Sequence, residues 1–191
     1  MSSQPTKPQS KRSENIRVHG FEPIYRHDAR VLILGTLPGQ VSLEIGQYYA
    51  QPLNAFWRIM SILNKFELNL SYEQRLECLK NAGIALWDVI ETADRKGSLD
   101  RKINKKTILV NSFDEMLNEC DDLTLICANG KDAFDLFQKY VSPVLSEKHR
   151  SLPMLRLPST SSALPMSSFV RIEQWRLCIE PHLLTRSNQN V

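Results

Sequence analysis

The sequence predicts a three-layer α/β/α sandwich whose central layer is a mostly parallel four-stranded sheet. Four short apolar runs have the length and branching of buried strands, and they occupy residues 31–35, 84–90, 123–128 and 152–157. Between these runs, apolar residues recur at helical spacing. Strands that alternate with helices are typical of a parallel sheet covered by helices on both faces.

The first half of the chain contains two of these strands and two helices. Residues 17–30 carry glycine and proline and predict an irregular lead-in to the first strand. A helix is expected over 54–66, where the apolar residues on one face are Phe56, Ile59, Met60, Leu63 and Phe66. Ser71 begins a capping box, so a second helix starts there, and Gly83 stops it just before the second strand.

The second half contains the other two strands and three helices. The polar, charged stretch 91–106 predicts a mobile surface loop, and a short extended piece is expected at 107–110. Helices are expected over 112–120, 131–141 and 167–184. The apolar residues at helical intervals in the last two are Phe134, Phe137 and Val141, then Phe169, Ile172, Trp175 and Ile179.

Composition indicates an ordinary soluble protein of one domain over residues 16–186, since 42% of residues are hydrophobic and 24% charged. The polar, basic residues 1–15 predict a disordered tail, and residues 187–191 a flexible end. No apolar stretch approaches the roughly 20 residues that span a bilayer, and the N-terminus lacks a secretory signal. We therefore expect a cytoplasmic monomer without a membrane partner.

The chain shows no spacing typical of a metal or cluster site. Its cysteines, none in a CxxC pair, are Cys78, Cys120, Cys127 and Cys178. Such thiols are expected to be reduced and structural, so we expect no metal and no cofactor. The formal net charge of +3 permits nucleic-acid binding but does not argue strongly for it.

Polar or aromatic residues follow all four predicted strands. They lie at 35–39 together with 48–54, at Asp88, at Asn129 and at 158–162. The carboxyl ends of parallel strands meet at one edge of the sheet, which is where open α/β sheets bind ligands. The sequence therefore predicts a pocket at this edge.

Five runs of sequence, each weak alone, together resemble one family. They are GTLPG, GQYYAQPLNAFWRIM, GIALWDVI, ANGKDAF and LPSTSSA, in that order. In combination they resemble the uracil-DNA glycosylase superfamily, and within it the branch that removes hypoxanthine, the deoxyinosine glycosylases. The resemblance covers about residues 20–180 and implies that the partner is DNA. It also implies that a damaged nucleotide is flipped out of the duplex before its N-glycosidic bond is hydrolysed.

The resemblance implies a role for several residues of the first two runs. Tyr49 occupies the position of the ring that stacks on the flipped base, while Tyr48 is as readily a packing residue. Leu37 stands in the base site where most of the superfamily carries an acidic or amide residue, and leucine cannot assist water. In the deoxyinosine branch the catalytic amide comes later, at a position that matches Asn54, although an asparagine before a helix is also a good N-cap. Pro38 and Gly39 are placed against the DNA.

The remaining runs supply base-binding and strand-binding candidates. Asp88 ends the second strand where relatives place a base-reading amide, and Asn129 ends the third; a strand turn or cap and an Asn-Gly turn are the structural alternatives. The last loop presses on the DNA strand in this family, and its matching residues here are Ser159, Thr160 and Ser161. Arg156 and Arg171 flank this loop and are phosphate candidates.

The leading hypothesis is a monofunctional DNA glycosylase for hypoxanthine that acts in base excision repair, with no lysine in the motifs to form a Schiff base. The alternatives are a uracil or G:U/T mismatch-specific glycosylase and a non-catalytic module that binds damaged DNA. A nucleotide-binding α/β enzyme is disfavoured because GTLPG has neither GxGxxG nor a lysine-serine pair.

Overall fold

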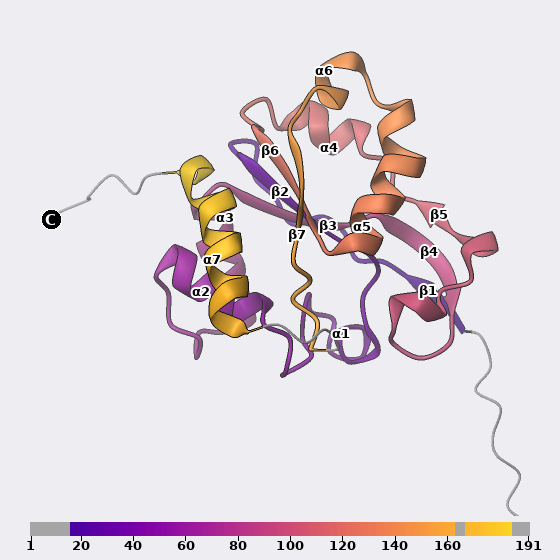
Figure 1. Cartoon of the computed structure of the whole chain (residues 1–191), viewed down its shortest axis with the longest axis horizontal. Coiled ribbons are helices and arrows are strands. Elements are labelled where there is room, and N and C mark those ends of the chain that lie inside the picture. The colour runs from indigo at the N-terminus through magenta and orange to yellow at the C-terminus, as the bar shows by residue number, and fades with distance from the viewer. Residues whose placement is uncertain (1–15, 163–166, 185–191) are drawn as a thin grey trace, which may run out of the picture.

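The computed structural model describes residues 16–162 and 167–184, so the tail expected at 1–15 and the end expected at 187–191 lie outside the described residues. At its centre is a parallel four-stranded sheet with the strand order β3-β2-β6-β7 (Figure 1). Its strands span Val31–Gly35 (β2), Ile84–Asp88 (β3), Leu125–Asn129 (β6) and Met154–Leu157 (β7). The fold class predicted from the sequence is confirmed.

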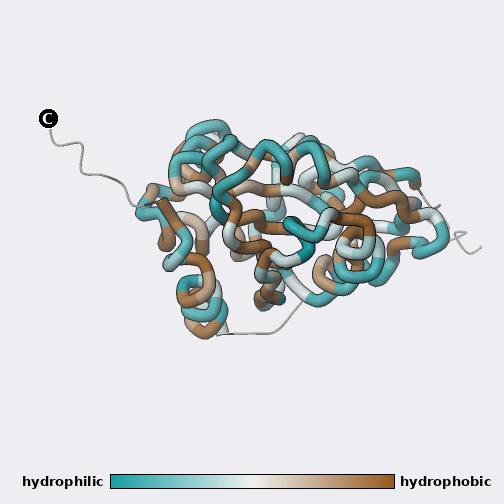
Figure 2. The backbone as a smooth tube through the Cα atoms, turned by 90° about the horizontal axis from the view of Figure 1, so that it is seen from above, coloured by the Kyte–Doolittle hydropathy of each residue, from teal (hydrophilic) through white to brown (hydrophobic). Residues whose placement is uncertain are grey.

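Strands β2 and β3 are buried along their whole length because apolar side chains pack against both faces of the sheet. Along β2, Leu32 and Leu34 join one core cluster, while Val31 and Ile33 join the other. This is the two-residue alternation of a strand with two covered faces. Figure 2 shows the hydrophobic stretches along the inner strands and the hydrophilic residues along the outer coils.

Three helices supply the core of one face, namely α2 (Phe56–Asn64), α3 (Tyr72–Asn81) and α7 (Ser168–Ile179). The core of the other face draws on α4 (Asp114–Glu119), α5 (Lys131–Leu136) and the π-helical turn Phe137–Val141 that continues it. The short α6 (Glu147–Arg150) leads into β7 (Figure 1). The predicted helices therefore exist, and the capping box of Ser71 with Gln74 starts α3 as expected.

A second, antiparallel sheet was not predicted, and the two expectations that cover it are wrong. It has the order β1-β4-β5, with β1 at Ile16–His19, β4 at Ile90–Arg95 and β5 at Leu109–Val110. The expected lead-in at 17–30 therefore begins as a strand, and the expected loop at 91–106 begins with β4. The reason is that β4 alternates buried residues with the charged Glu91 and Asp94, so that its composition looks like a loop.

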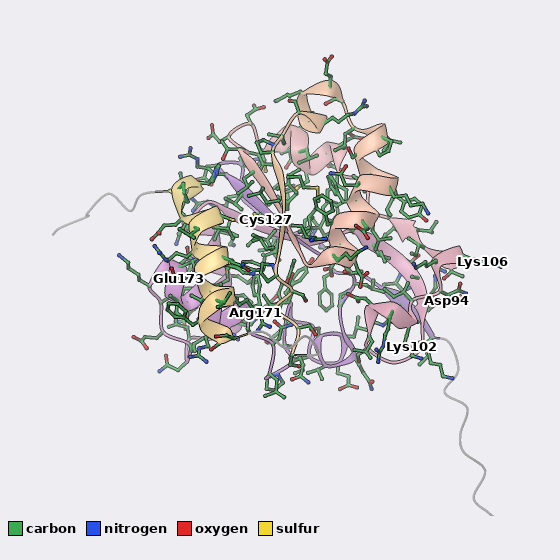
Figure 3. All side chains as sticks on the ribbon, in the orientation of Figure 1. Asp94, Lys102, Lys106, Cys127, Arg171 and Glu173 are labelled. Carbon is green, nitrogen blue, oxygen red and sulfur yellow. The ribbon has the colours of Figure 1, made fainter. Side chains whose placement is uncertain are left out.

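The segment after β4 is also ordered into two 3₁₀ turns, Asp100–Lys102 and Lys105–Thr107. Figure 3 shows Asp94, Lys102 and Lys106 on this side of the molecule, away from Cys127 near the centre of the parallel sheet. The expected extended piece at 107–110 corresponds to β5.

Helix α7 is oriented differently from the predicted arrangement. Phe169 is 70% exposed, and the buried residues of the helix are Arg171, Trp175 and Ile179. These three residues are four apart, so one stripe faces the core and Phe169 lies outside it. Within the described ranges, no helix has the length and apolarity to cross a membrane.

The carboxyl ends of the four parallel strands point to one edge, where the short α1 (Gln40–Ile45) lies beside the loop that follows β7 (Figure 1). The remaining 3₁₀ turns, Ser142–Val144 and Glu180–His182, do not belong to the loops that directly follow these four strands. The edge is therefore built from the loops after β2, β3, β6 and β7.

Candidate active site

A pocket of about 280 Å³ opens at the carboxyl edge of the parallel sheet. All the site residues predicted from the sequence line it, and they are Leu37, Pro38, Gly39, Tyr49, Asn54, Asp88, Asn129, Ser159, Thr160 and Ser161. Residues separated by more than 120 positions in the chain thus meet around one cavity, as expected for an α/β ligand site.

Tyr49 is held in a strained backbone conformation with its ring against the helix that follows. Its φ is +55°, which is uncommon for a residue other than glycine. The ring stacks on Phe56 with centroids 3.9 Å apart and planes 19° apart. The buried hydroxyl makes no hydrogen bond of standard geometry to the described residues, although the Asn129 side chain lies close enough to lower its pKa. Backbone strain at a pocket residue with an unused hydroxyl is typical of a ligand-binding position.

Tyr48 also borders the pocket and packs near Tyr49, with ring centroids 6.2 Å apart, but its polar groups are used within the fold. Its side chain is buried, and its hydroxyl donates to the carbonyl of Glu22 at 3.0 Å. Its own carbonyl accepts from the indole Nε1 of Trp57 at 2.9 Å. Tyr48 therefore fixes the loop to the core, while Tyr49 presents its hydroxyl to the pocket.

Asp88 lies at the bottom of the pocket, opposite Gly35 in the register of β2 and β3. It is only 4% exposed, and its Oδ2 has no hydrogen-bond partner among the described residues. A Cβ on Gly35 would lie 2.1 Å from Asp88 Oδ1 and 3.1 Å from Tyr49 Oη, so the carboxyl and the hydroxyl meet over this glycine.

The buried position changes the protonation of both groups. Burial, together with the nearby Asp100, raises the pKa of Asp88 to about 8, although Arg95 opposes the shift. Burial and the neighbouring Asp88 also raise the pKa of Tyr49. At neutral pH the Asp88 carboxyl is mostly protonated, so it offers one donor and one acceptor.

Asn54 precedes helix α2 at the wall of the pocket. Its Oδ1 accepts from the Phe56 N–H at 3.0 Å, which satisfies one of the unpaired donors of the first turn. Asn54 therefore helps to start the helix, as the structural alternative from the sequence expected, although the N-cap residue itself is Ala55. The bond to the Phe56 N–H uses only the carbonyl of the side chain and leaves the Nδ2 group to a ligand or a water molecule. The catalytic role stays a prediction that this geometry permits.

Asn129 and Thr160 clamp the loops after β6 and β7 together. Asn129 Nδ2 donates to Thr160 Oγ1 at 2.9 Å, and the Thr160 N–H donates to Asn129 Oδ1 at 2.8 Å. The Thr160 carbonyl accepts from the Ala55 N–H at 2.9 Å, which ties this clamp to the residue after Asn54. Thr160 is fully buried, whereas Ser159 and Ser161 are partly exposed. The clamp thus positions Asn54, and the two serines are the surface of this loop.

The loop after β2, residues 36–39 and called the first loop below, is held in place by Arg95, a residue that the sequence analysis did not identify. This arginine is 2% exposed, and its guanidinium donates to the carbonyls of Leu37 and Pro38. The residues that follow it, Ser98, Leu99 and Asp100, line the same pocket. The sequence contained a usable signal, because the alternating run Ile90–Arg95 ends in a Gly97-Ser98 turn that must return the chain to the sheet.

A second cavity of about 550 Å³ adjoins the first, with Tyr49, Gln51 and Asn54 in both walls. It is lined by three arginines, Arg58, Arg75 and Arg171. Arg171 is 6% exposed on α7 (Figure 3), whereas Arg156 is exposed on β7 and lines neither cavity. The three arginines therefore line the second cavity, whereas Asp88 lines only the first, and Asn54 lies in the wall of both.

Comparisons with known proteins match the chain across all these loops. A family model described as the uracil DNA glycosylase superfamily matches residues 22–176. A protein of Methanosarcina acetivorans named hypoxanthine DNA glycosylase is 34% identical over 157 residues, which is 82% of this chain and 94% of that protein. A protein of Methanosarcina barkeri with the same name is 39% identical over 117 residues, which is 61% of this chain and 73% of that protein.

The fold has a relative among solved structures. A solution NMR structure of a Methanosarcina acetivorans protein, described as a candidate uracil DNA glycosylase, matches with a TM-score of 0.73 and 30% identity. The match covers 87% of this chain and 98% of that one. The sequence and structure matches thus extend over the strands whose ends form the pocket.

Proposed function

The chain belongs to the uracil DNA glycosylase superfamily, and from this premise we propose that it is a DNA glycosylase that removes hypoxanthine from deoxyinosine in DNA. The observation that carries the proposal is that Tyr49, Asp88 and Asn54 line one pocket, where the Tyr49 hydroxyl and Asp88 Oδ2 are buried without a hydrogen bond of standard geometry. Two relatives at 34% and 39% identity are named for the same activity, which supports the choice of base.

Base recognition follows from the two groups at the bottom of the pocket. The protonated Asp88 carboxyl and the Tyr49 hydroxyl each offer a donor, and they lie side by side over Gly35. Hypoxanthine presents two acceptors, O6 and N7, on one edge, and its N1–H can donate to the second oxygen of Asp88. Adenine carries an amino donor in place of O6 and an unprotonated N1, so it pairs with the Asp88 carboxyl only if the donor and acceptor oxygens exchange places. With the donor held toward O6, adenine would leave that buried donor unpaired.

Bond cleavage is dissociative in this proposal. The bond between the purine and the sugar lengthens, positive charge develops on the sugar, and the leaving purine is stabilised by hydrogen bonds from the bottom of the pocket. Asn54, held by its bond to the Phe56 N–H, directs its Nδ2 group toward water or sugar. An amide orients a water molecule but is a poor base.

The product is an abasic site in an intact strand. Among the described residues, the pocket lining includes no lysine, so the amine that would form a Schiff base with the sugar is missing from it. Ser159 and Ser161 at the rim, with Pro38 and Gly39 opposite, are the proposed strand contacts, since hydroxyls and backbone N–H groups bind phosphate without sequence preference.

The test is a panel of end-labelled duplexes that contain inosine, uracil or only normal bases, each read with and without alkali. We expect alkali-dependent cleavage of the inosine strand and little reaction of the others. Faster release of uracil than of hypoxanthine would move the assignment to the uracil or mismatch-specific alternative. Tight binding to the inosine duplex without base release would identify a damaged-DNA-binding module instead.

A further inference from the structure

The reaction proposed above builds positive charge on the sugar, yet the first loop offers no anion to stabilise it. Leu37, the pocket residue of this loop between Thr36 and Pro38, is apolar and is buried with 6% exposure. Asn54 is neutral. A dissociative displacement is faster when a carboxylate faces the developing charge and accepts a proton from the attacking water.

The segment 95–100 is fixed against this same loop at several points. Arg95 donates to the carbonyls of Leu37 and Pro38 and, through Nε, to the carbonyl of Gly97 at 2.8 Å. The N–H of Gln40 donates to Ser98 Oγ at 3.1 Å. These bonds join the first loop to the segment 95–100 on both sides of Gly39. The position of the segment is therefore set by the first loop.

The last residue of this segment brings a carboxylate to the pocket. Asp100, at the start of a 3₁₀ turn, lines the pocket together with Asn54 and Asp88. It also borders a smaller cavity of about 250 Å³, and Thr36 lines both cavities with it. Thr36 lies close enough to this carboxylate to lower its pKa.

Asp100 remains mostly ionised at neutral pH. Its pKa is raised to about 6, chiefly by burial and also by Asp132, while Thr36 and the charge of Arg95 oppose the shift. The charged groups of the packed elements are the acids Asp88, Asp132 and Asp135 and the bases Arg95, Lys105 and Lys139. The two carboxyls of the pocket thus differ, with Asp88 mostly neutral and Asp100 mostly charged, a pattern typical of an acid and base pair.

We propose that Asp100 is a catalytic carboxylate of the glycosylase, supplied from the segment after β4 in place of the acid that the first loop lacks. The inference rests on the proposed function. As the bond between C1′ and N9 breaks, its electron pair leaves with the purine, which takes a proton from Asp88 or from solvent. Water adds to C1′, and Asp100 accepts its proton and later returns it to solvent.

The test is the single-turnover rate of hypoxanthine release from an inosine duplex by Asp100→Asn, a substitution of equal size. We expect the rate to fall about 10²–10⁴-fold, with the duplex Kd nearly unchanged. The rise of the wild-type rate through about pH 6 should be absent in the variant. Asp132→Asn is the matched control, since it lies beside Asp100 but outside the pocket lining, and it should keep most of the wild-type rate.

The outcomes separate this inference from the proposed function. A wild-type protein that releases no hypoxanthine would refute the proposed function itself. An active wild type together with an equally active Asp100→Asn, or with a variant that loses only DNA affinity, would overturn the role of Asp100 alone. Thermal unfolding of both variants checks the fold. A midpoint equal to that of the wild type shows that the lower rate of Asp100→Asn does not come from unfolding.

Discussion

In the proposed mechanism, Asn54 combines a structural and a chemical task in one side chain. Its Oδ1 caps the start of α2, and the clamp between Asn129 and Thr160 holds the adjacent Ala55 N–H. The cap orients the amide, so the two tasks depend on each other. They can be separated because only the oxygen is used by the helix.

Asn54→Ala should lower the rate of base release about 10²–10³-fold and the free energy of unfolding by about 0.5–2 kcal/mol, because both the amide and the cap are removed. Asn54→Asp is the matched control, since its carboxylate still accepts from the Phe56 N–H but has no donor. It should keep the stability and lose the activity, as read by thermal unfolding and single-turnover kinetics. Full activity in either variant would assign catalysis to another residue.

Asp88 makes the fold less stable as pH rises. Its pKa is about 8 in the folded chain against an ordinary value of 3.8, so between these values the folded state binds a proton that the unfolded state has lost. Stability therefore falls through this pH window and is highest below it.

Asp88→Asn removes this dependence, because the amide is neutral at every pH. We expect the variant to exceed the wild type by about 2–4 kcal/mol in free energy of unfolding at pH 7 and to match it near pH 4. Urea unfolding at the two pH values measures the difference. If the variant and the wild type differed by the same free energy of unfolding at both pH values, Asp88 would be ionised in the folded protein at pH 7.

At the scale of elements, β4 joins the second sheet to the active site. It ends in Arg95, whose guanidinium satisfies the backbone carbonyls of the first loop and of Gly97 from a buried position. The loop after β2 and the segment after β4 are consequently one unit, although more than fifty residues separate them.

Arg95→Met should destabilise the protein by about 2–5 kcal/mol, since it leaves the carbonyls of this loop without their donor. Arg17→Met is the matched control on the same sheet, because Arg17 is exposed, where water can replace its bonds to Asp94, Thr92 Oγ1 and the Thr107 carbonyl. It should cost about 1–2 kcal/mol, less than Arg95→Met. Chemical denaturation of both variants measures the losses of stability. Equal losses would contradict the role of Arg95 in holding the first loop.

The sequence predicted the elements whose patterns are local. The runs at 31–35 and 84–90 are mostly apolar, and they gave the two fully buried strands, although the second ends at Asp88 and Ile90 already begins β4. The strand β4 was missed because it carries the charged Glu91 and Asp94, and what identifies it is its pairing with β1, which no short window of sequence contains. Phe169 was misplaced because α7 turns Arg171 toward the core instead.

For the site too, the residues within recognisable motifs were predicted, and those that depend on contacts in space were not. Tyr49, Asn54 and Asp88 were identified because the family resemblance marks their motifs, and the structure brings them to one pocket. Asp100 and Arg95 were missed because they fall in the stretch expected to be a loop. The engagement of Asn129 with Thr160 depends on two loops meeting in space, which spacing along the chain does not reveal.

At the scale of the whole molecule, the parallel sheet couples the two cores. Alternate residues of β2 belong to the two clusters, so neither can be lost while the strand remains in place. Trp87 reports on one cluster, and Trp57 and Trp175 report on the other.

Unfolding in urea should therefore be a single transition. Variants that retain tryptophan only at position 87, or only at 57 and 175, should give the same midpoint by fluorescence and by far-UV circular dichroism after correction for their own stability. Two separate midpoints within one variant would show that the faces unfold independently.

The central claim is that one extruded purine occupies the pocket between Tyr49, Asp88 and Asn54. A crystal structure of Asn54→Ala with a duplex containing deoxyinosine measures this directly. We predict hypoxanthine in the pocket, with O6 or N7 within hydrogen-bond distance of Tyr49 Oη or of the Asp88 carboxyl. A base that stays stacked in the duplex, or that binds elsewhere on the protein, would contradict the account.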